Sequence, residues 1–419
     1  MPANFGSGVL DAPWLTSGPA GRVLALLNGD GEEARVIGGA VRNALLKIPL
    51  VDIDIATTAL PDEVIRRASA AGVKSVPTGI EHGTVTLVID KQPFEVTTLR
   101  QDTETFGRKA KVAFGRDWVR DAERRDFTIN GLSVDASGVV HDHVGGLADI
   151  AARRVRFIGD ASERIQEDYL RILRFFRFHA AYGAGEPDRA GYLACIAGRA
   201  GLSALSAERV RMETLKLMVA EGAATAAVAM VDGGLLSAIF GGVAYTGPFA
   251  AMIAVERLLG LAPDPIRRLG ALGVAVTEDA KRIAARLRLT NAETKALDSI
   301  GHRWWRLAGM DEATARRRLY RLGEDAYRNR LLLAWARAGG IDAPEWRQAA
   351  MLPQRWSAPK FPLRAADFVS RGIAEGPALG HVLTLAEDAW LAADFPLDDA
   401  ALKAIADQTV SRFTRDHRL

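Results

Sequence analysis

The stretch RVIGGAVRNALLKIPLVDIDIAT, residues 35–57, decides the fold of the first third of the chain. Arg35–Ile37 has the composition of a short strand, two glycines follow as a turn, and Ala40–Leu46 has helical spacing. The alternating run Val51–Ala56 then predicts a second strand. Strand, turn, helix and strand in close succession indicate an α/β pattern.

The sequence on either side extends this pattern and then changes character. From about Ser162 to the end the chain is rich in Ala, Leu and Arg with helical spacing. We therefore predict an α+β head, a small mixed sheet with helices, followed by an all-helical remainder. The further head elements that we expect are a helix at Gly21–Leu27, a helix from Pro61, and two strands, Gly83–Ile89 and Pro93–Leu99, joined as a hairpin.

Two acidic side chains stand out in the second strand. Side chains alternate between the faces of a strand, so Asp52 and Asp54 should project from the same face. Two adjacent carboxylates repel each other unless a cation lies between them, and oxygen ligands favour magnesium over zinc. A solvated strand face is the alternative. Glu95, on the later strand, is either a third carboxylate of this site or an ordinary surface residue.

The glycine turn points to a phosphate ligand. Gly38 and Gly39 let the backbone approach a ligand closely, and the helix that follows offers free N–H groups at its start. Arg42, in the first turn of this helix, adds a planar guanidinium group with several N–H donors. An ordinary strand-to-helix turn is the alternative. The motifs GxxxxGK[S/T] and GxGxxG are both absent from the sequence, which argues against a P-loop and a Rossmann fold.

The stretch that contains this turn and three further motifs, read in order, resemble a known family. GGAVRNALL-x5-DID, RRDFTINGL (124–132), EDYLRILRFFRF (167–178) and LSAERVRMETLK (205–216) together resemble class II tRNA nucleotidyltransferases, the CCA-adding enzymes. The bacterial poly(A) polymerases of the DNA polymerase β superfamily share them. FPLRAADFV and GPALGHVL, near the end of the chain, resemble the tail of the same family.

The resemblance implies addition of C, C and A to the 3′ end of tRNA from CTP and ATP. It implies an N-terminal segment (1–22), a catalytic head (23–155), a helical neck that reads the base (156–220) and a tRNA-binding body and tail (221–419). Asn43 and Lys47 depart from the family's common Asp and Gly. By the resemblance, Asp52 and Asp54 hold two Mg²⁺ ions, and the nucleotide is bound by Gly38, Gly39, Arg42, Arg125, Asp126, Asn130, Asp168, Arg171, Arg174 and Arg177. Glu95, from its place on the later strand, is the candidate for a third catalytic carboxylate.

The chemistry of the bases supports one of these assignments. Glu167–Arg174 has helical spacing, which would place Asp168, Arg171 and Arg174 on one arc, with Arg177 further round. Cytosine and adenine each present an amine beside a ring-nitrogen acceptor, which suits a carboxylate beside a guanidinium. Uracil and guanine present the reverse pattern. An Asp168–Arg171 pair would therefore select C and A; an exposed salt-bridged helix face is the alternative.

Basic residues gather in two other places. The segment Arg100–Asp126 mixes both charges with glycine and predicts a mobile loop. Between Lys281 and Arg337, fourteen basic residues face six acidic ones, a surplus of eight, whereas the whole chain has a net charge of +3. We expect tRNA phosphates to bind there. The residues that we assign to this contact are Arg316, Arg317, Arg318 and Arg321, and Trp304 or Trp305 could stack on a base or pack in the core.

Composition limits the remaining possibilities. Cys195 is the only cysteine, which excludes a disulfide framework and fits a reducing compartment. The N-terminus has no signal-peptide pattern, so we expect a cytoplasmic protein. The uncharged stretch between Asp232 and Glu256 contains six Gly or Pro residues, and it predicts two short helices, at 227–240 and 248–260, rather than a membrane span. We expect no membrane or protein partner, and His141–His143 should form a structural hairpin rather than a metal site.

The function that we predict is therefore magnesium-dependent, template-independent nucleotidyl transfer to tRNA. A poly(A) polymerase, or an enzyme that adds only A or only CC, is the nearest alternative, although the chain has no long basic C-terminal extension. A catalytically silent tRNA-binding protein is the rival from another class, and the intact pair Asp52 and Asp54 argues against it.

Overall fold

The computed structural model describes residues 9–10, 12–50, 52–106 and 109–416. Val51, Gly107 and most of the first eleven residues, on which parts of the sequence analysis rest, lie outside this description. The chain divides into two compact units, each described here by itself. The first consists of residues 1–244 and 285–288, and the second of residues 245–284 and 289–419.

The first unit is built on a seven-stranded mixed sheet. The strand order is β3-β4-β5-β2-β1-β8-β9. β2 pairs antiparallel with β1 but parallel with β5, and the other pairs are antiparallel. The strands are β1 (Ala34–Ile37), β2 (Asp54–Thr57), β3 (Lys74–Gly79), β4 (Thr84–Ile89), β5 (Gln92–Thr98), β8 (Ser133–Val134) and β9 (Val140–His141).

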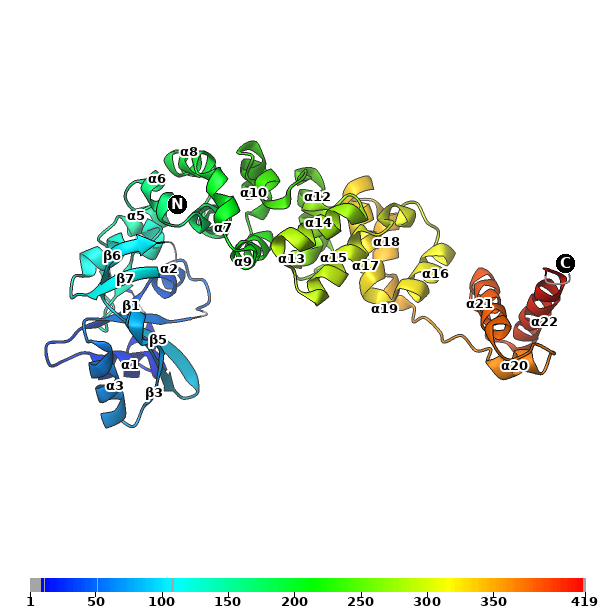
Figure 1. Ribbon diagram of the computed structural model, residues 1–419, viewed down its shortest axis with the longest axis horizontal. Helices are drawn as coiled ribbons and strands as arrows, with labels where there is room; N and C mark the ends of the chain where they lie inside the picture. The colour runs from blue at the N-terminus through cyan, green and yellow to red at the C-terminus, as the bar shows by residue number, and fades with distance from the viewer. Residues whose placement is uncertain (1–8, 11, 51, 107–108, 417–419) are drawn as a thin grey trace. The chain divides into compact units, whose positions relative to one another are not determined.

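Helices of the head pack on this sheet as the sequence predicts. α1 contacts α3, β1 and β4, while α3 also contacts β3 (Figure 1). Proline stands at the start of both helices, where its missing N–H costs nothing. The predicted α+β head is thus confirmed. Its helices are α1 (Pro19–Leu27), α2 (Gly39–Leu45), α3 (Pro61–Ala70), α4 (Trp118–Glu123) and α5 (Gly146–Ala151).

The expected loop at 100–126 is instead a β-hairpin followed by a helix. β6 (Arg100–Phe106) and β7 (Lys109–Phe114) pair antiparallel as a separate two-stranded sheet. In KAKVAF, charged and small residues alternate at first, as is typical of a strand. The mixture of charges in the surrounding segment hides this two-residue period. Asp117 then caps α4, since its carboxylate accepts from the N–H groups of Val119 and Arg120.

The helices that follow the head differ from the prediction at two places. Asp168 does not lie within a helix, because its backbone is extended and separates α6 from α7. The expected helix at 227–240 is two helices, with Gly234 in a left-handed conformation between them. The helices are α6 (Ala161–Glu167), α7 (Leu170–Tyr182), α8 (Arg189–Ala197), α9 (Ala207–Met218), α10 (Ala223–Asp232) and α11 (Leu235–Phe240).

The second unit is helical, as predicted. Its tail has a core around Phe368, Trp390 and Phe395, and no helix in the described ranges is long and apolar enough to cross a membrane. Trp304 is half-buried and donates to the carbonyl of Ala275, while Trp305 is exposed. The helices are α12 (Thr246–Leu258), α13 (Pro265–Gly273), α14 (Thr277–Leu287, whose last three residues are assigned to the first unit), α15 (Asn291–Gly301), α16 (Glu312–Leu322), α17 (Glu324–Ala338), α18 (Pro344–Ala350), α19 (Leu352–Arg355), α20 (Ala365–Val369), α21 (Pro377–Ala392) and α22 (Asp399–Asp416).

Two smaller sequence features have clear structural reasons. His141 contacts the carboxylate of Asp135 at 2.8 Å, and Asp142 accepts hydrogen bonds from four backbone N–H groups at the start of α5. The predicted hairpin is present, because β9, which ends at His141, pairs antiparallel with β8. Lys47 has a left-handed backbone (φ +56°), a conformation that favours glycine. This explains why glycine is common at the same place in the family that the motifs resemble.

Candidate active site

One hollow of the first unit gathers the residues that the motifs single out. It has a volume of about 750 Å³ and is formed by the glycine turn, the start of β2, the segment after α4, and α7 and α9. Among the predicted residues, only Glu95 and the four arginines assigned to tRNA are not in its wall. The lining residues are Gly38, Gly39, Arg42, Asn43, Asp52, Asp54, Arg125, Asp126, Asn130, Asp168, Arg171, Arg174, Arg177, Phe178, Tyr182 and Lys216.

The acidic pair lies at the entrance to β2. Asp54 is the first residue of the strand, and Asp52 precedes it rather than forming part of it, which corrects the predicted strand start. Glu95 lies beside Asp54, because parallel pairing of β2 with β5 sets Ile55 opposite Val96. Burial raises the pKa of Asp54, the charges of Glu95 and Asp52 raise it further, and Arg125 partly offsets them. These carboxylates repel one another.

A metal could relieve this repulsion, but the donor set is small. Within the described ranges, no group of three or more His, Cys, Asp and Glu side chains is arranged to hold a metal ion. Asp52 and Asp54 both face the hollow, whereas Glu95 is exposed outside its wall. The two-carboxylate site is thus the arrangement that fits a cation, and the third carboxylate stays a prediction.

The glycine turn allows a close approach beside this pair. Gly38 has a left-handed backbone (φ +66°), and a Cβ atom there would lie 3.2 Å from Nη1 of Arg125. Any side chain at Gly38 would therefore be strained and would crowd the guanidinium. Arg125 is held from the other side by Asp121, at 2.9 Å. The absence of a side chain at Gly38 thus lets Arg125 lie next to the acidic pair.

Arg42 is buried in the wall of the hollow and is only 6% exposed. Its guanidinium donates to the side-chain oxygens of Asn43 and Asn130 and, at 2.9 Å, to the hydroxyl of Tyr182. Burial lowers the pKa of Arg42, an effect that Tyr182 opposes. Asn43, which departs from the family's Asp, therefore serves as a neutral acceptor for Arg42.

Asp126 links the head to α7. Its carboxylate accepts from Nε of Arg174 at 2.7 Å and from the side chain of Asn130 at 3.0 Å. Burial alone would raise the pKa of Asp126, but Arg174, Asn130 and the N–H of Phe127 hold it below its ordinary value. Asp126, which follows α4, thus stays charged and fixes the orientation of the Arg174 side chain on α7.

The proposed base-reading pair is present in the hollow, but its two members do not contact each other in an ion pair. Oδ1 of Asp168 accepts from the N–H of Leu170 at the start of α7, and Oδ2 lies 2.6 Å from Arg209. Arg171 pairs with Glu167 and donates to the carbonyl of Arg164. The prediction that Asp168 shares a helical arc with Arg171 is wrong, because Asp168 ends one helix and caps the next.

Four functional candidates were missed, three of them because their partners are distant in sequence. Glu213, which is 4% exposed, accepts from Arg177 at 2.5 Å and lies 3.8 Å from Arg174. Arg209 and Lys216 lie on the same helix, α9, at positions four before and three after Glu213. This face of α9 was a usable signal, since its three polar residues share one side of the helix. Tyr182 is the fourth candidate. It follows Phe178 by four residues on α7, as Phe178 follows Arg174, so the three share one side of the helix.

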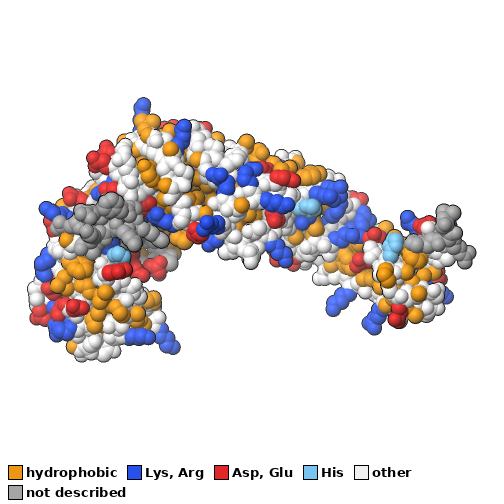
Figure 2. Space-filling view, viewed as in Figure 1, with side chains coloured by type: hydrophobic (Ala, Val, Ile, Leu, Met, Phe, Trp, Pro, Cys, Tyr) orange, Lys and Arg blue, Asp and Glu red, His pale blue; other side chains and the backbone are white. Residues whose placement is uncertain are grey.

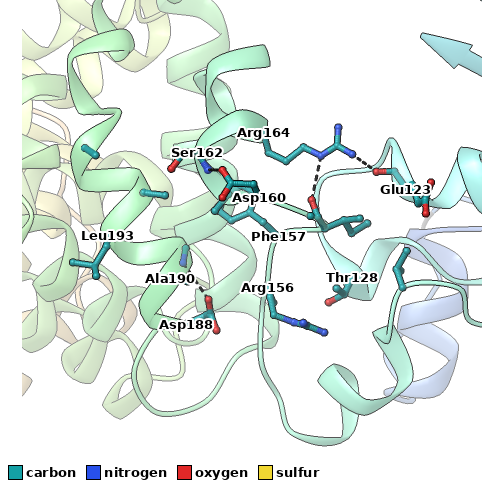
Figure 3. A pocket seen from close by; sticks show the side chains of 17 residues that line it. Glu123, Thr128, Arg156, Phe157, Asp160, Ser162, Arg164, Asp188, Ala190 and Leu193 are labelled. Atoms are coloured by element: carbon teal, nitrogen blue, oxygen red, sulfur yellow. Dashed lines mark hydrogen bonds between the residues drawn. The ribbon is translucent and has the colours of Figure 1, made fainter.

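A larger hollow, of about 990 Å³, lies near α6 and α8 but has no comparable chemistry. Figure 3 shows that its polar groups serve the local structure: Asp160 accepts from the N–H of Ser162, and Asp188 caps α8. Arg164 donates to the carbonyls of Ile158 and Glu123. The smaller hollow is therefore the better candidate site.

Comparison with known proteins identifies the relatives of the chain. Residues 34–156 match the poly A polymerase head domain family. The chain is 34% identical over 369 residues to CCA tRNA nucleotidyltransferase 1, mitochondrial, of Danio rerio, covering 85% of this chain and 83% of the relative. It is 32% identical to a CCA-adding enzyme of Limosilactobacillus fermentum, with 87% and 90% covered. The crystal structure of the Bacillus stearothermophilus CCA-adding enzyme in complex with CTP superimposes with a TM-score of 0.69 at 24% identity, covering 94% and 98%.

Proposed function

The chain belongs to the class II CCA-adding tRNA nucleotidyltransferases, and from this membership we propose how its residues complete the 3′ end of tRNA. The enzyme adds C, C and A from CTP and ATP and releases pyrophosphate. The observation that carries this assignment is a single hollow that combines an acidic pair, a glycine turn and arginines from two segments far apart in sequence. Nucleotidyl transfer needs mainly positioning and neutralisation of charge, which such a site supplies.

We assign the two ends of the nucleotide to the two ends of the hollow. Gly38, Gly39 and Arg42, with Arg125, would bind the triphosphate, while Asp168 and Arg171 would read the base. Arg174 and Arg177 lie between these groups on α7 and would bind the remainder of the nucleotide. The anchors of this set are buried carboxylates, which hold the arginines without closing the hollow; they are Asp121, Asp126 and Glu213.

The acidic pair fits magnesium. Only oxygen donors are present at Asp52 and Asp54, and the pKa of Asp54 is raised by burial and by its acidic neighbours, so a divalent cation would stabilise the pair. Bound there, magnesium would supply charge neutralisation at the reacting phosphate and activation of the terminal hydroxyl. Glu95 would contribute to the negative field at the same strand edges.

The proposed reaction is tested on tRNAs that end at successive positions. Transcripts lacking CCA, CA or only A are incubated with CTP, ATP or both, and their 3′ ends are sequenced. We expect addition to stop after the complete CCA end. Addition of a long A tract would indicate a poly(A) polymerase instead. Addition limited to A or to CC would indicate a partial enzyme.

Some of the arginines assigned to tRNA binding already form ion pairs with acidic residues of the second unit. Arg316 pairs with Glu312 at 2.8 Å and with Asp394 at 3.0 Å, and Arg321 pairs with Asp388. Figure 2 shows acidic side chains among the basic ones on the visible face of the helical part. Arg317 donates to the neutral hydroxyl of Thr314. Part of the basic surplus is therefore neutralised locally.

We expect charge reversal of Arg317 and Arg318 together to weaken tRNA binding and to flatten its salt dependence. Each lost phosphate contact should lower the slope of log K against log salt concentration by about 0.9. The matched control is Arg316→Glu, which breaks contacts with Glu312 and Asp394 and should act mainly on thermal unfolding. A slope that is unchanged in the double variant would place the tRNA backbone elsewhere.

The compartment in which the enzyme acts is left as a prediction. The sequence suggests the cytoplasm, whereas the Danio rerio relative is named as mitochondrial. The boundaries proposed for head, neck, body and tail also stay predictions. The contacts between segments place α10, α11 and residues 285–288 in the first compact unit.

A further inference from the structure

Two aromatic rings on α7 form part of the hollow's wall. Phe178 and Tyr182 are four residues apart, so they lie on the same side of the helix, and their ring centroids are 5.7 Å apart. Phe178 is only 5% exposed, whereas Tyr182 is half-buried and presents its hydroxyl to the head. We call this pair of rings the aromatic shelf.

The shelf holds Arg42, which comes from the head. The guanidinium carbon lies 3.9 Å from the ring centroid of Tyr182 and 5.2 Å from that of Phe178, within cation–π range. Nη2 of Arg42 also donates to the Tyr182 hydroxyl at 2.9 Å. The ring thus fixes the plane in which Arg42 lies, and the hydroxyl fixes the direction of one of its N–H groups.

Arg42 depends on this support more than its neighbours do. Arg174 and Arg177 share the ring of Phe178, at 5.2 and 4.2 Å, but each is held by a carboxylate, of Asp126 and Glu213 respectively. The side-chain hydrogen bonds of Arg42 within the described residues go instead to neutral oxygens. Its positive charge therefore remains available to an anion, while its orientation relies on neutral contacts.

We propose that Tyr182 is a positioning residue for the triphosphate, acting through Arg42. The inference deepens the proposed function and rests on it, because Arg42 is taken to bind the phosphate end of CTP and ATP. Tyr182 is at the end of α7, eleven residues after Arg171, which corresponds to about 16 Å along a helix axis. Its influence should therefore reach the phosphate end and not the choice of base.

The test compares Tyr182→Phe, which keeps the ring, with Tyr182→Ala, which removes it. Loss of one hydrogen bond to a charged group should raise KM for CTP and for ATP equally, by about tenfold in Tyr182→Phe, and by more in Tyr182→Ala, with smaller changes in kcat. Inorganic tripolyphosphate, a probe without a base, should lose potency as an inhibitor by the same factor. The preference for CTP over UTP should not move.

A matched control separates positioning from folding. Tyr192→Phe also removes a tyrosine hydroxyl from the first unit, where it donates to the carbonyl of Ala229 outside the hollow, and it should leave KM unchanged. In an Arg42→Ala background, Tyr182→Phe should cause no further loss of tripolyphosphate inhibition, because the residue through which it acts is gone.

Several results would overturn the proposal. These are unchanged KM and tripolyphosphate inhibition in Tyr182→Phe, a loss confined to one nucleotide, or additive effects of Tyr182→Phe and Arg42→Ala. Failure of the proposed function would give a different result from failure of the proposed role of Tyr182. The unchanged enzyme would then add no nucleotide to any tRNA, and tripolyphosphate binding by direct titration would still show whether Tyr182 acts on an anion through Arg42.

Discussion

Replacing Asp54 by alanine should lower the rates of both C and A addition by about a thousandfold or more. Charge stabilisation of a phosphoryl transition state by a bound metal is worth several kcal/mol, and each 1.36 kcal/mol corresponds to a factor of ten. The rates are measured under single-turnover conditions at saturating magnesium. Binding of tRNA, measured separately, should stay near that of the unchanged enzyme, because the carboxylate serves the reaction rather than docking.

The same variant offers its own check on folding. The pKa of Asp54 is raised by burial and by neighbouring acids, so the fold disfavours the charge that the alanine removes. Asp54→Ala should therefore unfold at the same temperature as the unchanged enzyme or at a higher one. Asp90→Ala, in an exposed turn of the head, is the matched acidic control and should retain full activity. Near-normal turnover of Asp54→Ala would contradict the metal assignment.

Asp168→Ala should weaken the selection of bases. It removes the proposed acceptor for the amines of C and A, which would also be the group that opposes the carbonyl of U. The loss of a good two-point contact is worth about 1–3 kcal/mol, so the preference for CTP over UTP should fall about ten- to a hundredfold. The preference is measured as the ratio of single-turnover rates on a tRNA that awaits its first C.

The contacts of Asp168 determine the controls for this experiment. Because its carboxylate also caps α7, Asp168→Ala will lose stability as well as selectivity. Asp188→Ala removes a similar cap from α8, outside the candidate site, and should lower stability without changing the CTP to UTP ratio. An equal loss for CTP, ATP and UTP in Asp168→Ala would show that this residue is structural and that bases are chosen elsewhere.

The head was predictable because its signals are local. Alternation identified β4 and β5, and a glycine turn between an apolar strand and a helix identified β1 and α2. The motif resemblance then named almost every residue of the hollow. The break at Asp168 was missed because apolar residues keep helical spacing on both sides of it, so the periodic signal runs on through the interruption.

The supporting residues could not be predicted in the same way. The shared polar face of α9 pointed to Glu213, but the roles of Glu213 and Tyr182 depend on partners that only the folded chain brings near. The hairpin β6–β7 was missed for a different reason. Its charged residues obscured a two-residue period, and the pairing of the two strands supplies the stability that local sequence does not.

The parallel pairing of β2 with β5 has a consequence for the balance between stability and activity. Asp54 and Glu95 are far apart along the chain, so they approach each other only when the sheet has closed. Their repulsion therefore destabilises the native state and is absent from the unfolded state. The native state would gain stability by losing the charge of Asp54, and the catalytic role proposed for Asp54 would explain why that charge is kept. This part of the sheet is thus a place where selection for turnover opposes selection for a durable fold.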